Sequence, residues 1–151
     1  MAKDLASAID IDAGPQQVWS VLADLDAYSE WNPFIVRAEG KAAPGTRLTL
    51  RFQPVVGRPT TLHPTVLEAE EGARLRWRGR LGVPGLLDAD HRFTIEAGAD
   101  GRSRLRQEER FSGLLAPLVA RSLDRGTLPA FRLMNEALKR RVEAPAGRAR
   151  G

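Results

Sequence analysis

The stretch that decides the fold is residues 89–113, which read ADHRFTIEAGADGRSRLRQEERFSG. Apolar and polar residues alternate on both sides of its centre, and this period of two is typical of half-buried β-strands. The central Ala-Asp-Gly suits a three-residue hairpin loop, because Gly101 can adopt the left-handed backbone conformation that such loops need. We therefore predict two antiparallel strands joined by a tight turn.

This loop fixes which residues of the two strands face each other. The expected pairs are Ile95 with Leu105, Phe93 with Gln107, and His91 with Glu109. All six side chains would share one face, which is mostly apolar but carries an imidazole, an amide and a carboxylate. A few polar groups that converge on an apolar face are typical of a ligand cavity. A shift of one residue would turn the whole set to the opposite face.

Length and composition restrict the class of protein. A chain of 151 residues without cysteine is expected to form one domain, residues 1–143, with a disordered tail at 144–151. Disulfides, thiol catalysis and zinc–thiolate sites are excluded. The first ten residues contain no apolar signal core, and no apolar run approaches the roughly 20 residues of a membrane span. We expect a cytoplasmic protein without stable membrane insertion.

Basic residues outnumber acidic ones and give a net charge of +4. Only three of the 23 basic residues are lysines, and the arginines mostly alternate with apolar residues along predicted strands instead of forming a run. This pattern favours a solvated outer sheet face over a nucleic-acid surface, and the sequence contains no aromatic ladder or RNA-binding motif. We expect no nucleic-acid partner.

The N-terminal part is predicted to contain one strand and two helices. Residues 5–12 alternate loosely as a strand. Pro15 then starts a helix at residues 16–24, because proline is favoured in the first turn of a helix. A shorter helix at 27–31 is expected to begin with Asp26 as its N-cap.

This region resembles the opening of the START/SRPBCC superfamily, above all its polyketide cyclase/dehydrase and lipid-transport branch. The resemblance is carried by IDAGPQQVWSVLAD at residues 11–24 and YSEWNPF at 28–34, and it extends over about residues 6–143. It implies the helix-grip fold, an α+β arrangement in which a curved antiparallel sheet of about six or seven strands wraps around a long C-terminal helix. It also implies a small apolar ligand in an internal cavity. Branches of the superfamily place their catalytic residues differently, so none is carried over.

The same alternation predicts the rest of the sheet. Further strands are expected at residues 34–39, 47–52, 60–69 and 74–81. Pro64 interrupts the third of these, which argues for an edge or a bulge. A second three-residue loop at 70–72 would pair Leu67 with Leu75, Thr65 with Trp77, and His63 with Gly79. The four arginines of residues 74–81 would point outwards, since an unpaired buried charge costs several kcal/mol.

Two segments flank the opening hairpin. The apolar loop at residues 82–87 is either a tucked connection or a lid over the cavity mouth. Helical spacing after the hairpin predicts a kinked or broken helix at about 115–125 and 128–143, with Thr127 as a new cap and Pro129 in the first turn of its second part. The first part carries an apolar stripe of Leu115, Leu118, Val119 and Leu123.

The enclosed face is predicted to bind a ligand. The candidate ligand-binding residues are Trp31, Phe34, Phe52, Trp77, His91, Phe93, Leu105, Gln107, Glu109, Phe111, Phe131, Met134 and Leu138. Aromatic and methionine residues at this spacing usually pack in a core, so only a minority is expected to touch the ligand. Burial of apolar ligand surface would supply the affinity, while His91, Gln107 and Glu109 would set its orientation.

His91 and Glu109 are the candidate catalytic residues. A histidine can exchange a proton near neutral pH, and an opposing carboxylate can orient it, which would suit a cyclisation or a dehydration without a cofactor. The alternative, which we favour, is a structural polar pair that is satisfied by hydrogen bonds, with Gln107 as a third member. A metal site that also used His63 lacks typical ligand spacing. We expect neither a metal nor a cofactor.

Three functions stay open at this level. The favoured one is binding or transport of a small hydrophobic ligand, such as a lipid, a polyketide or an aromatic metabolite. The others are a cofactor-independent polyketide cyclase/dehydratase, and a module that docks a partner protein or a membrane surface through the basic outer face or the 82–87 loop. A monomer and a homodimer are both compatible, because an exposed strand edge at 34–39 would permit a dimer.

Overall fold

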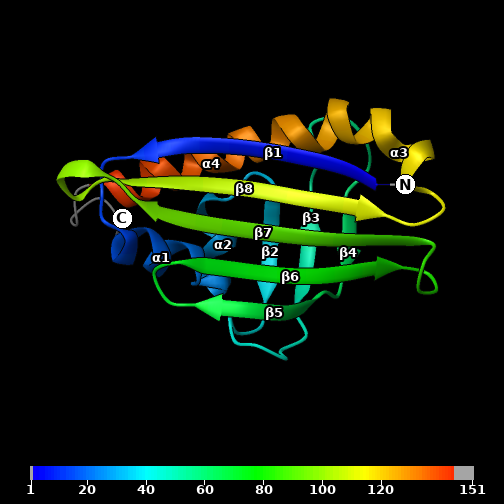
Figure 1. The fold of residues 1–151 in the computed structure, drawn as a ribbon, viewed down its shortest axis with the longest axis horizontal. Helices are drawn as coiled ribbons and strands as arrows, with labels where there is room; N and C mark the ends of the chain where they lie inside the picture. The colour runs from blue at the N-terminus through cyan, green and yellow to red at the C-terminus, as the bar shows by residue number, and fades with distance from the viewer. Residues whose placement is uncertain (1, 145–151) are drawn as a thin grey trace.

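Eight β-strands and a long C-terminal helical segment form residues 2–144, the part of the chain that this computed structural model describes (Figure 1). The strands are β1 (Ala2–Ile11), β2 (Ile35–Glu39), β3 (Thr49–Phe52), β4 (Thr60–Leu62), β5 (Thr65–Glu70), β6 (Arg74–Leu81), β7 (Leu87–Ala97) and β8 (Ser103–Ser112). The helices are α1 (Pro15–Leu22), α2 (Tyr28–Trp31), α3 (Ala116–Ser122) and α4 (Leu128–Glu143), with short turns η1 (Leu25–Ala27), η2 (Ala99–Gly101) and η3 (Leu123–Thr127). Residues 145–151 of the predicted tail lie outside the described residues. None of the described helices is long and apolar enough to cross a membrane.

The strands form two antiparallel sheets. The larger has the order β1-β8-β7-β6-β5, and the smaller has the order β2-β3-β4, with β2 at an edge as predicted. A single bridge between Arg47 and Thr65 connects them among the described residues. In Figure 1 the smaller sheet crosses behind the larger one, and α4 runs along β1, against which it packs. This is the predicted α+β helix-grip fold, with one strand more than expected because the predicted strand 60–69 divides at Pro64.

The β7–β8 hairpin has the register that the alternation predicts. The facing pairs are Ile95 with Leu105, Phe93 with Gln107, and His91 with Glu109. All six side chains are buried. The turn places both Asp100 (φ 58°) and Gly101 (φ 75°) in the left-handed region, so the loop residues do fix the register.

The turn of the β5–β6 hairpin differs from the prediction. It covers residues 71–73, so that Glu70 faces Arg74. The reason is that Gly72, with φ of 77°, occupies the middle of the turn and not its last position. The predicted pairs Leu67–Leu75, Thr65–Trp77 and His63–Gly79 are therefore wrong.

A β-bulge in β5 changes the faces as well as the register. The pairing shifts between Val66 and Glu68, which leaves Leu67 turned towards solvent. Ala69 takes the place opposite Leu75, and Val66 takes the place opposite Trp77. The expectation that Pro64 marks an edge or a bulge is confirmed, because the chain leaves the small sheet before this residue and enters the edge of the large sheet after it.

The helices after β1 follow the predicted order. Pro15 opens α1, and the side-chain oxygen of Gln17 accepts a hydrogen bond from the Gly14 N–H (3.0 Å). The prediction that Asp26 caps the second helix is wrong. Asp26 lies inside η1, which runs directly into α2, and the Tyr28 N–H is satisfied by a backbone carbonyl.

The predicted break in the C-terminal helix is a π-helical turn. From α3 through η3 to α4 the backbone stays helical, and Thr127 has helical angles without a side-chain cap, contrary to the prediction. A π turn tolerates Pro129, which lacks an N–H to donate to the preceding turn. Gly126 is buried in this turn, and its carbonyl accepts a hydrogen bond from the Val55 N–H (3.0 Å). The loop after β3 is therefore attached to the helix at this point.

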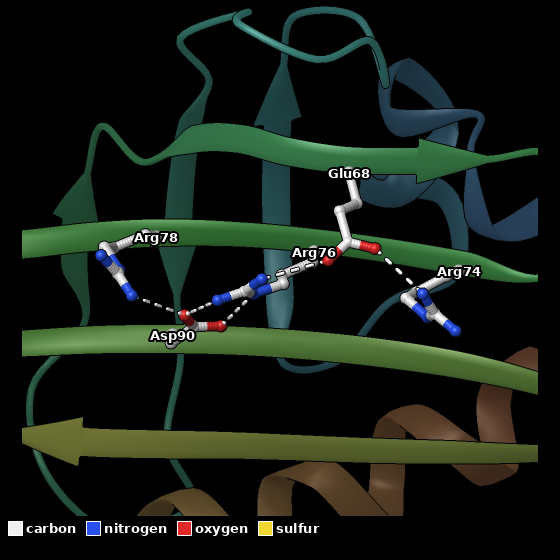
Figure 2. A network of polar contacts seen from close by, with 5 residues as sticks. All are labelled: Glu68, Arg74, Arg76, Arg78 and Asp90. Carbon is white, nitrogen blue, oxygen red and sulfur yellow. Dashed lines mark hydrogen bonds and ion pairs between the residues drawn. The ribbon is translucent and has the colours of Figure 1, made fainter.

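The outer face of the larger sheet carries a network of ion pairs (Figure 2). Arg76 donates to Asp90 through Nε and Nη2 (2.8 and 2.7 Å) and to Glu68 through Nη1 (3.1 Å). Arg78 also donates to Asp90, and Arg74 to Glu68. Partial burial by itself would raise the pKa of Asp90, but the hydrogen bonds and charges of Arg76 and Arg78 outweigh it and lower that pKa. The four arginines expected on this face thus pair with carboxylates of adjacent strands.

Candidate functional site

A cleft of about 290 Å³ opens where the start of β7 and the end of β8 meet the C-terminal helix. The loop after β3 closes it on one side, and α3 with η3 closes it on another. Its walls are mostly apolar and include Phe34, Phe52, Leu87, Phe111, Val119 and Leu123. An apolar cavity of roughly 150 Å³ holds benzene, so this cleft has room for a molecule of about two fused rings.

Glu109 is the acidic side chain among the described residues that line this cleft. It lies on β8, two residues before Phe111, and only 8% of its surface is exposed. Arg58 lines the cleft from the loop after β3 and is exposed to solvent. A carboxylate in such an apolar wall needs a partner, because burying an uncompensated charge is unfavourable.

The partner of Glu109 is His91, which lies directly behind it in the core. The His91 ring has no exposed surface. Trp77 stacks on it with ring centroids 5.1 Å apart, and Phe93 and Phe131 pack against it at 4.7 and 5.2 Å. The imidazole is therefore fixed by three aromatic side chains and cannot touch a ligand in the cleft.

A buried chain of polar side chains connects His91 to the C-terminal helix and β1. His91 Nε2 lies 3.0 Å from Gln107 Oε1, and Gln107 Nε2 donates to Asn135 Oδ1 (2.8 Å). Asn135 Nδ2 then donates to Ser7 Oγ (3.2 Å). Gln107 Nε2 also faces the Phe131 carbonyl at 3.5 Å. Because a carbonyl only accepts, this contact fixes the Gln107 amide orientation, and His91 Nε2 must carry the hydrogen.

The other ring nitrogen faces the carboxylate. His91 Nδ1 lies 3.2 Å from Glu109 Oε2, yet the angle does not suit a hydrogen bond, so the contact is an electrostatic one. The imidazole and the carboxylate are therefore in close contact at the wall of the cleft without a hydrogen bond between them.

The predicted site residues divide into two groups. Four of them line the cleft: Phe34, Phe52, Glu109 and Phe111. The others do not line it and pack in the core around it: Trp31, Trp77, His91, Phe93, Leu105, Gln107, Phe131, Met134 and Leu138. Trp31 is only partly buried and packs edge-on against Tyr28. The predicted inner face is thus mainly a core, and the cleft lies at its end.

Sequence reasoning missed the cleft walls that come from the loop after β3 and from the polar residues of α3 and η3. Val56 and Arg58 belong to the loop after β3, and Ser122 and Thr127 belong to the helical segment. The one sequence signal for Val56 and Arg58 is an apolar loop with turn residues, PVVGRP at 54–59. Its composition resembles that of the 82–87 loop, which was considered as a possible lid.

His63 lies apart from His91 and Glu109. It is exposed and lines an outer groove together with Arg47 and Arg78. The metal site considered from the sequence would need His63 on the inner face, so the structure contradicts it. Within residues 2–144, no group of three or more metal-ligating side chains converges.

Solved structures with the same fold include several enzymes. The chain is similar to the Zhui aromatase/cyclase from a Streptomyces species, with 19% identity, a TM-score of 0.75, and coverage of 95% of this chain and 98% of that one. It is similar to a START superfamily protein from Mycobacterium smegmatis (19%, TM-score 0.71, coverage 93% and 97%). The chain spans about half the length of the di-domain ARO/CYC protein BexL (16%, TM-score 0.74, coverage 95% and 51%). At these identities the likeness shows the fold alone.

The sequence itself identifies the family. Residues 3–143 match the profile described as polyketide cyclase / dehydrase and lipid transport. No curated protein sequence matches the chain significantly. Because the profile covers nearly the whole chain, the protein belongs to the polyketide cyclase/dehydrase and lipid transport family.

Proposed function

We infer that the protein binds a small apolar molecule in the cleft and holds the molecule's polar group against Glu109. The observation that carries this proposal is a nearly buried carboxylate in a mostly apolar wall, backed by a buried imidazole at 3.2 Å. Membership of the family, whose description includes lipid transport and polyketide cyclisation, supports a ligand of this kind.

The lining of the cleft restricts the chemical class of the ligand. Phe34, Phe111 and Leu123 favour a flat or aliphatic hydrocarbon body. Glu109 favours a hydroxyl or another hydrogen-bond donor, because a carboxylate only accepts hydrogen bonds. Covering roughly 200 Å² of apolar ligand surface would contribute about 5 kcal/mol before the costs of association.

Calorimetric titration with naphthol and naphthalene tests this proposal. The two probes have the same ring system and differ by one hydroxyl group. We expect the wild-type protein to bind naphthol at least ~10-fold more tightly, since a hydrogen bond to a charged acceptor contributes about 1.5–3 kcal/mol. Glu109→Leu should remove this preference while naphthalene still binds.

Two substitutions on α3 serve as a matched pair for the location. Val119 lines the cleft, whereas Leu118 points to solvent. Val119→Trp should abolish binding of both probes by filling the cleft, and Leu118→Trp should leave both affinities unchanged. Equal binding of naphthol and naphthalene by the wild type, or naphthol binding that survives Val119→Trp, contradicts the proposal.

A second candidate function is proton transfer to and from the bound molecule. The close contact between the His91 imidazole and the Glu109 carboxylate favours it, and Glu109 is the member that reaches the cleft. In this scheme the Glu109 carboxylate removes a proton beside a ligand carbonyl, and His91 is a positioning residue. This reverses the roles that the sequence suggested, because the His91 ring has no surface in the cleft.

Hydrogen–deuterium exchange of the two-ring ketone tetralone distinguishes this candidate from simple binding. Proton NMR in deuterium oxide measures the loss of the hydrogens beside the carbonyl. A general base typically contributes about 10²–10⁴-fold, so we expect accelerated exchange that Glu109→Gln abolishes. If the protein binds tetralone but the exchange is no faster than in buffer alone, the result contradicts proton transfer and supports simple binding.

A further inference from the structure

Exposed apolar side chains surround the mouth of the cleft. Most of the large hydrophobic residues on the described surface belong to three segments at this end: Val55 and Val56, Leu81 and Val83, and Leu114 and Leu118. The exposed fractions of Leu114 and Leu118 reach 81% and 79%, and those of Val83 and Val56 reach 67% and 64%. Such a concentration on one end of a soluble fold indicates an interaction surface. We call these six residues the apolar rim.

Leu118 of the apolar rim lies on the solvent side of α3, and Leu114 lies just before this helix. Leu118 was predicted to belong to the buried stripe, but the stripe divides. Val119 and Leu123 face the cleft, whereas Leu114 and Leu118, four residues apart, face away from the protein. The same solvent face continues with Arg121 and Arg125, at spacings of three and four. This is an amphipathic pattern of leucine followed by arginine, directed outwards.

Backbone hydrogen bonds hold the three segments together. Leu114 N–H donates to the Gly85 carbonyl and Leu115 N–H to the Leu86 carbonyl, both at 3.0 Å. On the other side, Val55 N–H donates to the Gly126 carbonyl at 3.0 Å. Figure 1 shows the β6–β7 loop and α3 at the same end of the molecule. The apolar rim is therefore a preformed surface and not a set of independent loop tips.

Three arginines beside the apolar rim are unpaired. Within residues 2–144, no carboxylate lies within 4.0 Å of Arg58, Arg121 or Arg125. The nearby acidic residues Asp124 and Asp88 already pair with Lys3 and Arg80. By contrast, Arg74, Arg76 and Arg78 on the outer sheet face pair with Glu68 and Asp90 (Figure 2). This end of the protein thus combines protruding apolar groups with uncompensated positive charge.

We propose that the apolar rim docks the protein onto the surface of a bilayer that contains anionic lipids. Leucine and valine tips can enter the boundary between headgroups and acyl chains, while Arg58, Arg121 and Arg125 meet the phosphates. Protruding apolar side chains next to unpaired arginines match the acyl chains and the anionic phosphates of such a bilayer, so the bilayer is the better fit. The mouth of the cleft would then face the acyl chains, and an apolar molecule could enter without crossing water.

Co-sedimentation with vesicles tests the docking without any cleft ligand. The full chain is mixed with phosphatidylcholine vesicles with or without phosphatidylglycerol. We expect binding that needs the anionic lipid and weakens at high salt. Arg121→Glu and Arg125→Glu should each lower the partition coefficient about fivefold or more, because each basic residue contributes ~1 kcal/mol near an anionic surface.

Matched variants locate the contact. Leu118→Glu should reduce vesicle binding at least ~10-fold, since a charge replaces a side chain that enters the interface. Leu67→Glu and Arg92→Glu alter exposed residues on β5 and on the outer sheet face, away from the apolar rim, and they should have no effect. Thermal unfolding confirms that each variant is folded. In the presence of vesicles with brominated acyl chains, the tryptophan fluorescence of Leu118→Trp should be quenched more strongly than that of Leu67→Trp.

Three outcomes overturn the docking proposal. The first is no binding to anionic vesicles. The second is binding that Leu118→Glu leaves intact or that the control variants weaken equally. The third is a homodimer, or a complex with an acidic protein, in which Leu118 is buried, together with no binding of the protein to vesicles. Naphthol titration of the same variants distinguishes membrane docking from ligand binding in the cleft. The Val119→Trp variant should lose naphthol binding yet retain vesicle binding.

Discussion

At the scale of single residues, the central feature is the division of labour between Glu109 and His91. Alternation along two strands and a three-residue loop sufficed to predict that they face each other. The pattern could not show which of the two reaches the cleft, because that depends on Trp77 and Phe131, which come from other elements and enclose the imidazole. Glu109 is left as the group that can meet a ligand.

The polar chain behind His91 gives a prediction for stability. Gln107→Leu removes the acceptor of His91 Nε2–H and the donor to Asn135 Oδ1. Because both groups stay buried, we expect a loss of about 2–4 kcal/mol in the free energy of unfolding. Gln16→Leu, at an exposed position, should change it by less than about 0.5 kcal/mol. Urea denaturation measures both free energies of unfolding. Equal effects of the two substitutions would show that the hydrogen-bonded polar side chains behind His91 make no specific contribution to stability.

At the scale of elements, the walls of the cleft are joined by contacts between distant segments. Pro129 and Gly126 indicated an interruption of the C-terminal helix, and the interruption exists. Its form as a π turn, and its attachment to the loop after β3, depend on a hydrogen bond between Val55 and Gly126 that no local pattern encodes. For the same reason the bulge at Leu67 was not predictable. The predicted register of β5 is therefore wrong, whereas the predicted register of β7 and β8 is confirmed.

Gly126 offers a test in which two effects have opposite signs. Helix propensity alone predicts that Gly126→Ala stabilises the protein by up to about 1 kcal/mol. In the structure a Cβ at this position would collide with the backbone carbonyl of Val56. We therefore expect destabilisation by about 1–3 kcal/mol and weaker naphthol binding, because the loop must move away from the helix. A variant that is more stable than the wild type would contradict the attachment of this loop.

At the scale of the whole molecule, the outer face of the larger sheet and the surface around the apolar rim differ in whether their arginines are paired with carboxylates. Sequence composition showed an excess of arginine, and the alternation correctly placed Arg74, Arg76 and Arg78 on the outer face. It could not show that carboxylates of neighbouring strands pair with them, since this depends on the order of strands in the sheet. The apolar rim was anticipated only at the 82–87 loop, which carries Val83, whereas Leu118 fits a buried stripe equally well by spacing alone.

The ion pairs of the outer face predict how stability depends on pH. The pKa of Asp90 is lowered in the folded protein by Arg76 and Arg78 despite partial burial, and the pKa of Glu68 is lowered by hydrogen bonds from Arg74 and Arg76. The unfolded chain therefore binds more protons in acid, and stability falls as the pH drops below about 5. Asp90→Asn should flatten this fall, whereas Asp100→Asn, in the β7–β8 loop, should not. Urea denaturation between about pH 7 and pH 3 measures the slopes, and parallel slopes for all three proteins would contradict this assignment.

The central claim is that the cleft beside Glu109 is the ligand site, and a crystal structure with a brominated naphthol tests it most directly. The anomalous signal of bromine locates the probe without bias from its shape. We predict one bromine peak inside the cleft, between Phe111 and Leu123, with the naphthol oxygen in hydrogen-bond contact with the Glu109 carboxylate. A bromine peak elsewhere on the protein, with the cleft closed or occupied by side chains, would contradict the account.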